Sequence, residues 1–289
     1  MGPRATRRNG GRQLHLQHGP IDLLIETEDH RETAFLAAET RFASILDELV
    51  AELPALGTEV ADTTPPPSGP VAGRMHAATL PHAGVFITRM ASVAGAVADE
   101  ILAAMQSAAS LTRAFVNNGG DIAFHLERSQ NFTVQMSAHD GTPLGSVAIS
   151  GADGIGGLAT SGWRGRSHSL GIADSVTVLA KSAAAADVAA TLIANAIDLP
   201  DHPGIHRTPA QDLWPDSDLG GRLATTGCAT LAPTEVAKAL DQGEAVARDM
   251  QARGLLHAAA LFLQGQARFV GEGAFFPRLT THSPDQHNA

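Results

Sequence analysis

The chain has 289 residues, 44% hydrophobic and 17% charged, so it can bury one large core or two modest ones as a globular protein. Its net charge of -10 argues against nucleic acid as the main partner, because phosphate backbones bind to clustered positive charge. No apolar run reaches the roughly 18 residues of a membrane span, and the single cysteine, Cys228, excludes an intrachain disulfide. Without a secretion signal, we expect a cytoplasmic protein with no membrane partner.

Residues 1–12 are predicted to form a disordered basic tail, because their four arginines are not followed by an apolar segment. We expect a single α+β domain over residues 13–276 and a polar C-terminal tail over 277–289. Two short strands around Gly19-Pro20 open this domain.

The later elements follow from hydrophobic periodicity and from turn residues. In chain order we expect a helix over 30–51, a loop over 63–70, a helix over 90–105, four short strands over 112–150, strand-like segments over 157–162 and 170–180, a helix over 182–198, a Pro- and Asp-rich loop over 199–221, a helix over 233–253 and a strand pair turned at Gly265. Helices and antiparallel-looking strands mix without β-α-β alternation, which predicts an α+β fold.

The segment from Gly154 to Ala159 satisfies the loose G-x-G-x-x-A pattern of dinucleotide-binding proteins. A Rossmann loop must open a helix, but the residues that follow here are polar and strand-like. The 13 histidines contain no His-Glu-x-x-His motif, so we expect them to be structural or surface residues. Neither feature therefore predicts a site.

A polar stripe on the predicted helix 182–198 is a better candidate. Asp187, Thr191 and Asn195 recur every four residues and share one helix face. A carboxylate and a hydroxyl one turn apart are hard oxygen donors suited to Mg²⁺ or Ca²⁺. The alternative is a solvated helix face.

A glycine step lies between two strand-like runs, at Asn118, Gly119, Gly120 and Asp121. Glycine lets the backbone N–H groups of residues 119 and 120 approach a phosphate or a planar ring closely. A hairpin turn built on Asn-Gly explains the same residues, and the two interpretations are compatible.

Two further segments carry small or hydroxyl side chains. Residues 90–95 begin a helix, whose free N–H groups attract anions, although close helix packing also explains them. Thr160, Ser161 and Gly162 end a strand with two hydroxyls and a glycine, which a turn also explains.

These four segments match one family in order and approximate spacing. The chain resembles the ApbE superfamily, whose best-known members are FAD:protein FMN transferases, from about residue 84 to 198. The motifs that carry the resemblance are Ala91-Ser92-Val93-Ala94-Gly95 followed by Asp99, Gly119-Gly120-Asp121, Thr160-Ser161-Gly162, and Ala186, Asp187, Ala190 and Thr191. Gly165 to Asp174 resembles a segment of an uncharacterised cytoplasmic branch of the superfamily.

The resemblance implies antiparallel sheets layered with covering helices. It implies a magnesium ion bound by Asp187, Thr191 and a backbone carbonyl near Ala94, and FAD or a related nucleotide as substrate. The residues expected at the nucleotide are Ser92, Gly95, Asn118, Gly119, Gly120, Asp121, Thr160, Ser161 and Gly162.

The chain departs from the transferase pattern at two places. Ala94 stands where the transferases have a lysine, and residues 167–171 lack their His-x-x-Asp-Pro segment. Arg164 and Arg166 lie close by in sequence and could supply the lost positive charge. Three functions remain open: FAD cleavage or FMN transfer to water or a protein acceptor, flavin binding or cofactor assembly without catalysis, and a reaction on another phosphorylated metabolite.

Overall fold

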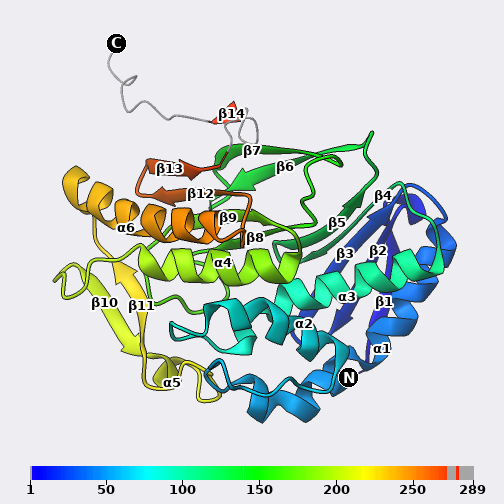
Figure 1. Ribbon diagram of the computed structural model, residues 1–289, viewed down its shortest axis with the longest axis horizontal. Coiled ribbons are helices and arrows are strands. Elements are labelled where there is room, and N and C mark those ends of the chain that lie inside the picture. Colours follow the sequence, from blue (N-terminus) through cyan, green and yellow to red (C-terminus); the bar gives the residue numbers. More distant parts are fainter. Residues whose placement is uncertain (1, 139, 272–277, 280–289) are drawn as a thin grey trace.

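The computed structural model describes residues 2–138, 140–271 and 278–279. Its centre is a nine-stranded sheet in the order β1-β2-β3-β4-β5-β8-β9-β12-β13, in which neighbouring strands are antiparallel (Figure 1). The strands are β1 (Arg4–Arg8), β2 (Gln13–His18), β3 (Ile21–Thr27), β4 (Arg113–Asn118), β5 (Asp121–Leu126), β8 (Gly157–Ser161), β9 (Ser175–Ala180), β12 (Ala258–Leu263) and β13 (Gln266–Val270).

Four helices cover one face of this sheet: α1 (Arg31–Leu56), α3 (Val93–Ala108), α4 (Ala183–Ala196) and α6 (Pro233–Ala252). Alternate residues of the strands, such as Leu23 and Ile25 of β3, point to these helices and are fully buried. A shorter helix, α2 (Pro70–Thr79), packs on α3 as an outer layer. The alternation of buried apolar residues along the strands therefore determines which face of the sheet the helices cover.

The other face of the sheet is partly covered by a small sheet of order β14-β7-β6, with β6 (Asn131–Ser137), β7 (Pro143–Ser150) and β14 (Arg278–Leu279). Met136, Val147 and Ile149 of this sheet pack against Phe124 and Leu158. Because β9 lies under both layers, all six of its residues are buried.

The remaining elements lie between the main ones. They are three short 3₁₀ turns, η1 (Asn9–Gly11), η2 (Leu80–His82) and η3 (Arg89–Ser92), the strand pair β10 (Ile205–Pro209) and β11 (Leu223–Cys228), and the one-turn helix α5 (Ala210–Leu213). No helix among the described residues is long and apolar enough to cross a membrane.

The predicted α+β fold of antiparallel sheets layered with helices is confirmed. The prediction of a disordered tail over residues 1–12 is wrong, because Arg4–Arg8 forms the edge strand β1 and pairs with β2. Arg7 fixes this strand further, since its guanidinium stacks on Phe35 and pairs with Glu32. The predicted C-terminal tail lies outside the described residues except for Arg278–Leu279, which pair with β7.

Besides the strands β1, β11 and β14, one strand and two helices were not expected from the sequence. Helix α2 begins at Pro70, a favourable first helical residue, at the end of the predicted loop. Strand β10 and helix α5 lie in the segment 199–221, which was predicted to be a loop. All three are short, and tertiary contacts support them more than their own periodicity does.

Candidate functional site

The candidate site is built on the first turns of α3 and α4, which contact each other through carboxylates. Asp187 of α4 accepts a hydrogen bond from Gly95 N–H of α3 at 3.1 Å. Asp99 of α3 accepts hydrogen bonds from the N–H groups of Ala183 and Ala184 of α4 at 3.0 and 2.9 Å. The N–H groups of a first helical turn lack partners within the helix, so a carboxylate there is stabilising.

Gly95 is required by this contact, because a Cβ at that position would lie 2.6 Å from Ala184 N and closer still to the Ala183 carbonyl group. The small residues at the start of α3 are therefore explained by close helix packing. The Gly95 N–H group is bound by Asp187, so it does not receive an external anion there.

The hairpin turn between β4 and β5 lies against the same helix start. Asn118 donates from Nδ2 to the Ala94 carbonyl oxygen at 3.1 Å and pairs with Asp121 across the turn. Gly119 and Gly120 have φ of +67° and +115°, as a turn of this kind requires. The Gly120 N–H group donates to Asn117 Oδ1 at 2.9 Å, so in this structure a side chain of the protein occupies the donor that was expected to contact a phosphate.

Two cavities open on either side of these elements. The larger, about 510 Å³, lies between the β4–β5 turn, the strands β8 and β9 and the hairpin β6–β7. The smaller, about 280 Å³, lies between η3, α4 and the segment 214–219. Both are lined by the same seven residues, which we call the junction: Ala94, Asp121, Ser161, Arg166, Ser167, Asp187 and Thr191.

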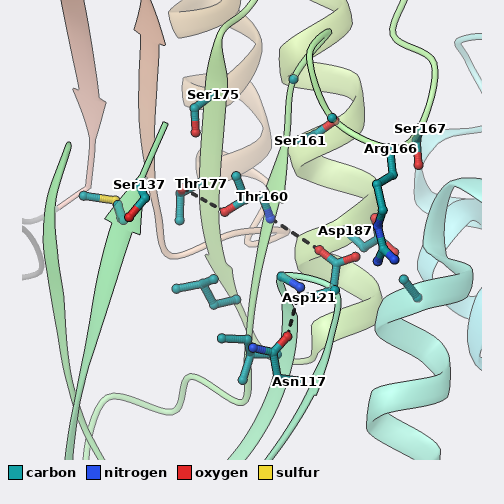
Figure 2. Close-up of a pocket in the computed structure, with 18 of the residues that line it drawn as sticks. Asn117, Asp121, Ser137, Thr160, Ser161, Arg166, Ser167, Ser175, Thr177 and Asp187 are labelled. Atoms are coloured by element: carbon teal, nitrogen blue, oxygen red, sulfur yellow. Dashed lines mark hydrogen bonds between the residues drawn. The ribbon is translucent and has the colours of Figure 1, made fainter. Parts of the chain in front are cut away.

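Two carboxyl groups face each other at the junction, from the start of β5 and from α4 (Figure 2). Burial raises the pKa of Asp121 to about 7, and the Thr160 N–H group and the charge of Arg166 oppose this effect. Burial, and next the charge of Asp121, raises the pKa of Asp187 well above its ordinary value. The two carboxyl groups therefore repel each other when both are ionised, and a cation bound between them would stabilise the ionised forms.

The oxygen donors at the junction fit a magnesium ion. Asp187 and Thr191 lie one helical turn apart, and Ala94, whose carbonyl oxygen accepts a hydrogen bond from Asn118, lines both cavities beside them. The Thr191 hydroxyl makes no hydrogen bond to any residue that the structure describes. Within the described ranges, no cluster of three or more His, Cys, Asp or Glu side chains has an arrangement that could hold a metal ion by itself. Magnesium, however, commonly uses one or two carboxylates and leaves its other positions to water and substrate phosphates.

Comparison with known proteins identifies the family. Residues 4–269 match the family model described as "AbpE bacteria". The chain belongs to this family. The predicted membership of the ApbE superfamily is thereby confirmed, and the relatives next described fit the uncharacterised branch.

The chain is similar to UPF0280 protein MK0206 of Methanopyrus kandleri, with 39% identity over 107 residues, which are 37% of this chain and 42% of the relative. It is similar to a UPF0280 protein of Methanothermobacter thermautotrophicus, with 39% identity over 116 residues, 39% of this chain and 43% of that one. These matches span less than half of the relatives' length.

Among solved structures, the chain is similar to an ApbE protein of Thermotoga maritima, with 12% identity and a TM-score of 0.52. That match covers 94% of this chain and 98% of the other, so the shared fold extends over nearly the whole of this AbpE chain.

The structure brings most of the predicted site residues of this family member to one place. Gly119, Gly120, Asp121, Thr160, Ser161 and Gly162 line the larger cavity, together with the three predicted metal ligands Ala94, Asp187 and Thr191. The third residue of the polar stripe on α4, Asn195, has a different role from Asp187 and Thr191. It accepts hydrogen bonds from Ser169 Oγ and Leu170 N–H and so holds the end of a loop.

Three predicted nucleotide contacts have internal roles. The Ser92 hydroxyl is fully buried and donates to the Arg89 carbonyl at 3.0 Å. Gly95 contacts α4, and Asn118 anchors the hairpin turn. None of the three lines either cavity, although Gly95 and Asn118 are hydrogen-bonded to Asp187 and Ala94, which do.

Several cavity residues were not predicted. Trp214 and Phe86 line the smaller cavity, and Asp174, Ser175 and Thr177 line the larger one. They come from loops and from β9, and apart from Asp174, which ends the Gly165–Asp174 segment, no local motif marks them. Only the full three-dimensional fold places them at the site.

Proposed function

We propose that the protein is a magnesium-dependent enzyme that cleaves the pyrophosphate of a flavin dinucleotide, transferring the FMN part to water or to a protein hydroxyl. The observation that carries this proposal is the junction itself: two facing carboxylates between two cavities of about 510 and 280 Å³. A dinucleotide has one ring system on each side of a pyrophosphate, so its shape and charge match a divided cavity with a cation at the division.

Asp187, Thr191 and the Ala94 carbonyl would hold the magnesium ion, which supplies charge neutralisation at the pyrophosphate oxygens when bound. The first turns of α3 and α4 keep these donors in place, because Asp187 is bonded to Gly95 N–H and Asp99 caps α4. Positioning by rigid elements of this kind contributes to catalysis by lowering the entropy lost on reaching the transition state.

In the proposed reaction the acceptor oxygen forms a bond to the phosphorus of the FMN part. The bond from that phosphorus to the bridging oxygen breaks, and AMP leaves with this oxygen. The acceptor proton passes to Asp121, whose pKa of about 7 suits a proton acceptor near neutral pH. Family membership and the shared fold support this assignment, together with the resemblance to FMN transferases.

A second function is favoured by Ala94, which stands where the transferases have a lysine. We propose as the alternative a flavin-binding or cofactor-assembly protein without catalytic turnover. It differs from the first proposal in one observable, because it binds the nucleotide and releases no product.

The test begins with denaturing the purified protein and identifying any released small molecule by absorbance and mass. The protein is then incubated with FAD, with and without Mg²⁺, and AMP and FMN are quantified by chromatography. Asp187→Asn is expected to abolish magnesium-dependent release, whereas Asp249→Asn, the same change on the exposed face of α6, should not. Full activity in Asp187→Asn would reject the metal assignment, and binding of FAD without product would favour the alternative.

A further inference from the structure

Arg166 is the one arginine among the seven junction residues. It comes from the loop after β8 and lines both cavities, with a side chain exposed to them. Its guanidinium lies on Gly119, where a Cβ would be 2.7 Å from Cζ and closer still to Nη2. A side chain at residue 119 would therefore displace the guanidinium from its present position.

The Arg166 guanidinium is not used to hold the fold. Within the ranges that the structure describes, it makes no hydrogen bond and no ion pair within bonding distance. Its charge acts to lower the pKa of the Asp121 carboxyl, and Figure 2 shows its side chain pointing from its loop toward Asp121 and Asp187. The Arg166 side chain is exposed and faces the cavities, so it is free to contact a ligand bound there.

Other groups that bind anions at this place are already occupied. Gly95 N–H is bonded to Asp187, and the N–H groups of Ala183 and Ala184 are bonded to Asp99. Gly120 N–H is bonded to Asn117. Of the backbone donors that the sequence suggested for phosphate, those of Gly95 and Gly120 thus serve protein acceptors.

Arg164, the other cation considered from the sequence, points elsewhere. Its Nε atom lies 3.8 Å from Asp174 Oδ1, and its guanidinium stacks on the Trp163 ring. Of the two arginines, the structure thus leaves Arg166 as the one available to a ligand at the junction.

We propose that Arg166 is the anion receptor of the site, binding through its guanidinium the pyrophosphate of a metal–nucleotide complex. It supplies from a loop the positive charge that Ala94 does not supply from α3. The assignment of a pyrophosphate ester as ligand rests on the proposed function. A planar guanidinium with two parallel N–H groups suits a phosphate oxygen pair better than a lysine ammonium does.

The test uses inorganic pyrophosphate as ligand and Mn²⁺ as the metal, measured by titration calorimetry on the full chain. Arg166→Ala is expected to weaken pyrophosphate binding on the order of 10- to 100-fold, the range for a lost charged hydrogen bond. Arg166→Lys should recover only part of the affinity, because it keeps the charge and loses the fork. Binding of Mn²⁺ alone should be unchanged or tighter, since a positive charge near the carboxylates is removed.

Gly119→Ala provides a second route to the same result, because its methyl group takes the place of the guanidinium while Arg166 remains in the sequence. Its control is Gly154→Ala, where φ is +69° and a Cβ meets nothing within 4 Å. Both variants carry the same backbone strain, so only Gly119→Ala should lose pyrophosphate affinity.

Pyrophosphate binding by Arg166→Ala as tight as in the wild-type protein would overturn the inference, and so would a wild-type protein that binds no pyrophosphate. Loss of Mn²⁺ binding in Arg166→Ala would overturn it too, by showing that the residue supports the metal site. Arg166-dependent pyrophosphate binding without any FAD cleavage would leave the inference standing and reject the proposed enzyme activity, so the two failures are distinguishable.

Discussion

Substitution of Gly95 by alanine tests whether the contact between α3 and α4 builds the site. The added Cβ would lie 2.6 Å from Ala184 N, and the surrounding atoms are backbone, which cannot rotate away. An ordinary contact needs at least 3.4 Å, so the two helix starts must separate by about 1 Å. Such overpacking against rigid backbone costs about 3 kcal/mol, at the upper end of the usual range.

Alanine also gains about 1 kcal/mol over glycine inside a helix, which leaves a net loss of about 2 kcal/mol in the free energy of unfolding. Gly73→Ala in α2 is the matched control, because a Cβ there meets nothing within 4 Å. That variant should be stabilised by about 1 kcal/mol. Chemical unfolding followed by circular dichroism measures both values, and Mn²⁺ titration should show weaker binding in Gly95→Ala only. A Gly95→Ala protein as stable as Gly73→Ala would refute the packing reasoning.

Three further predictions follow from other contacts. Thr191→Val should weaken Mn²⁺ binding on the order of tenfold by removing a hydroxyl ligand, and Thr40→Val on α1 should not; equal Mn²⁺ affinities in titration would exclude Thr191 as a ligand. Asp99→Ala should lower the free energy of unfolding by about 2 kcal/mol in urea, because two N–H groups at the start of α4 lose their acceptor. Burial, and next the charge of Arg253, lowers the pKa of His82 to about 4, so its contribution to stability is present above the unfolded pKa and is lost as pH falls toward 4. Compared with His82→Gln, the wild-type protein should lose about 3 kcal/mol more over this interval, and parallel stability curves of the two would contradict this reading.

Sequence reasoning found the elements with clear periodicity. The helix at 182–198 and the strands over 112–150 have strong local patterns, so their positions agree with α4 and with β4 to β7. The edge strand β1 was missed because its sequence, with three arginines in five residues, lacks apolar alternation, and pairing with β2 and stacking on Phe35 define it. Short elements stabilised by neighbours cannot be read from their own residues.

For the site, sequence reasoning located the segments but not the internal contacts that some of their residues make. Motif spacing brought together the glycine step and the stripe with Asp187 and Thr191, which line one cavity. It could not tell that Gly120 N–H is used by Asn117, or that Gly119 receives Arg166, because both depend on side-chain direction. Trp214 carried no signal, since residues far apart in sequence meet it only in the fold.

The exchange of carboxylates between α3 and α4 restricts how a ligand can enter. Because Asp99 and Asp187 bind each helix to the start of the other, a rotation of α3 against α4 would break three hydrogen bonds at once. The loop that carries Arg166 is held at its far end by Asn195, and Asp218 in the segment 214–219 is bonded to Thr88. If the proposed metal site is correct, we expect a ligand to reach it by an outward movement of residues 163–168 and 214–219 over the two helix starts, so ligand exchange should be sensitive to the stiffness of these two loops.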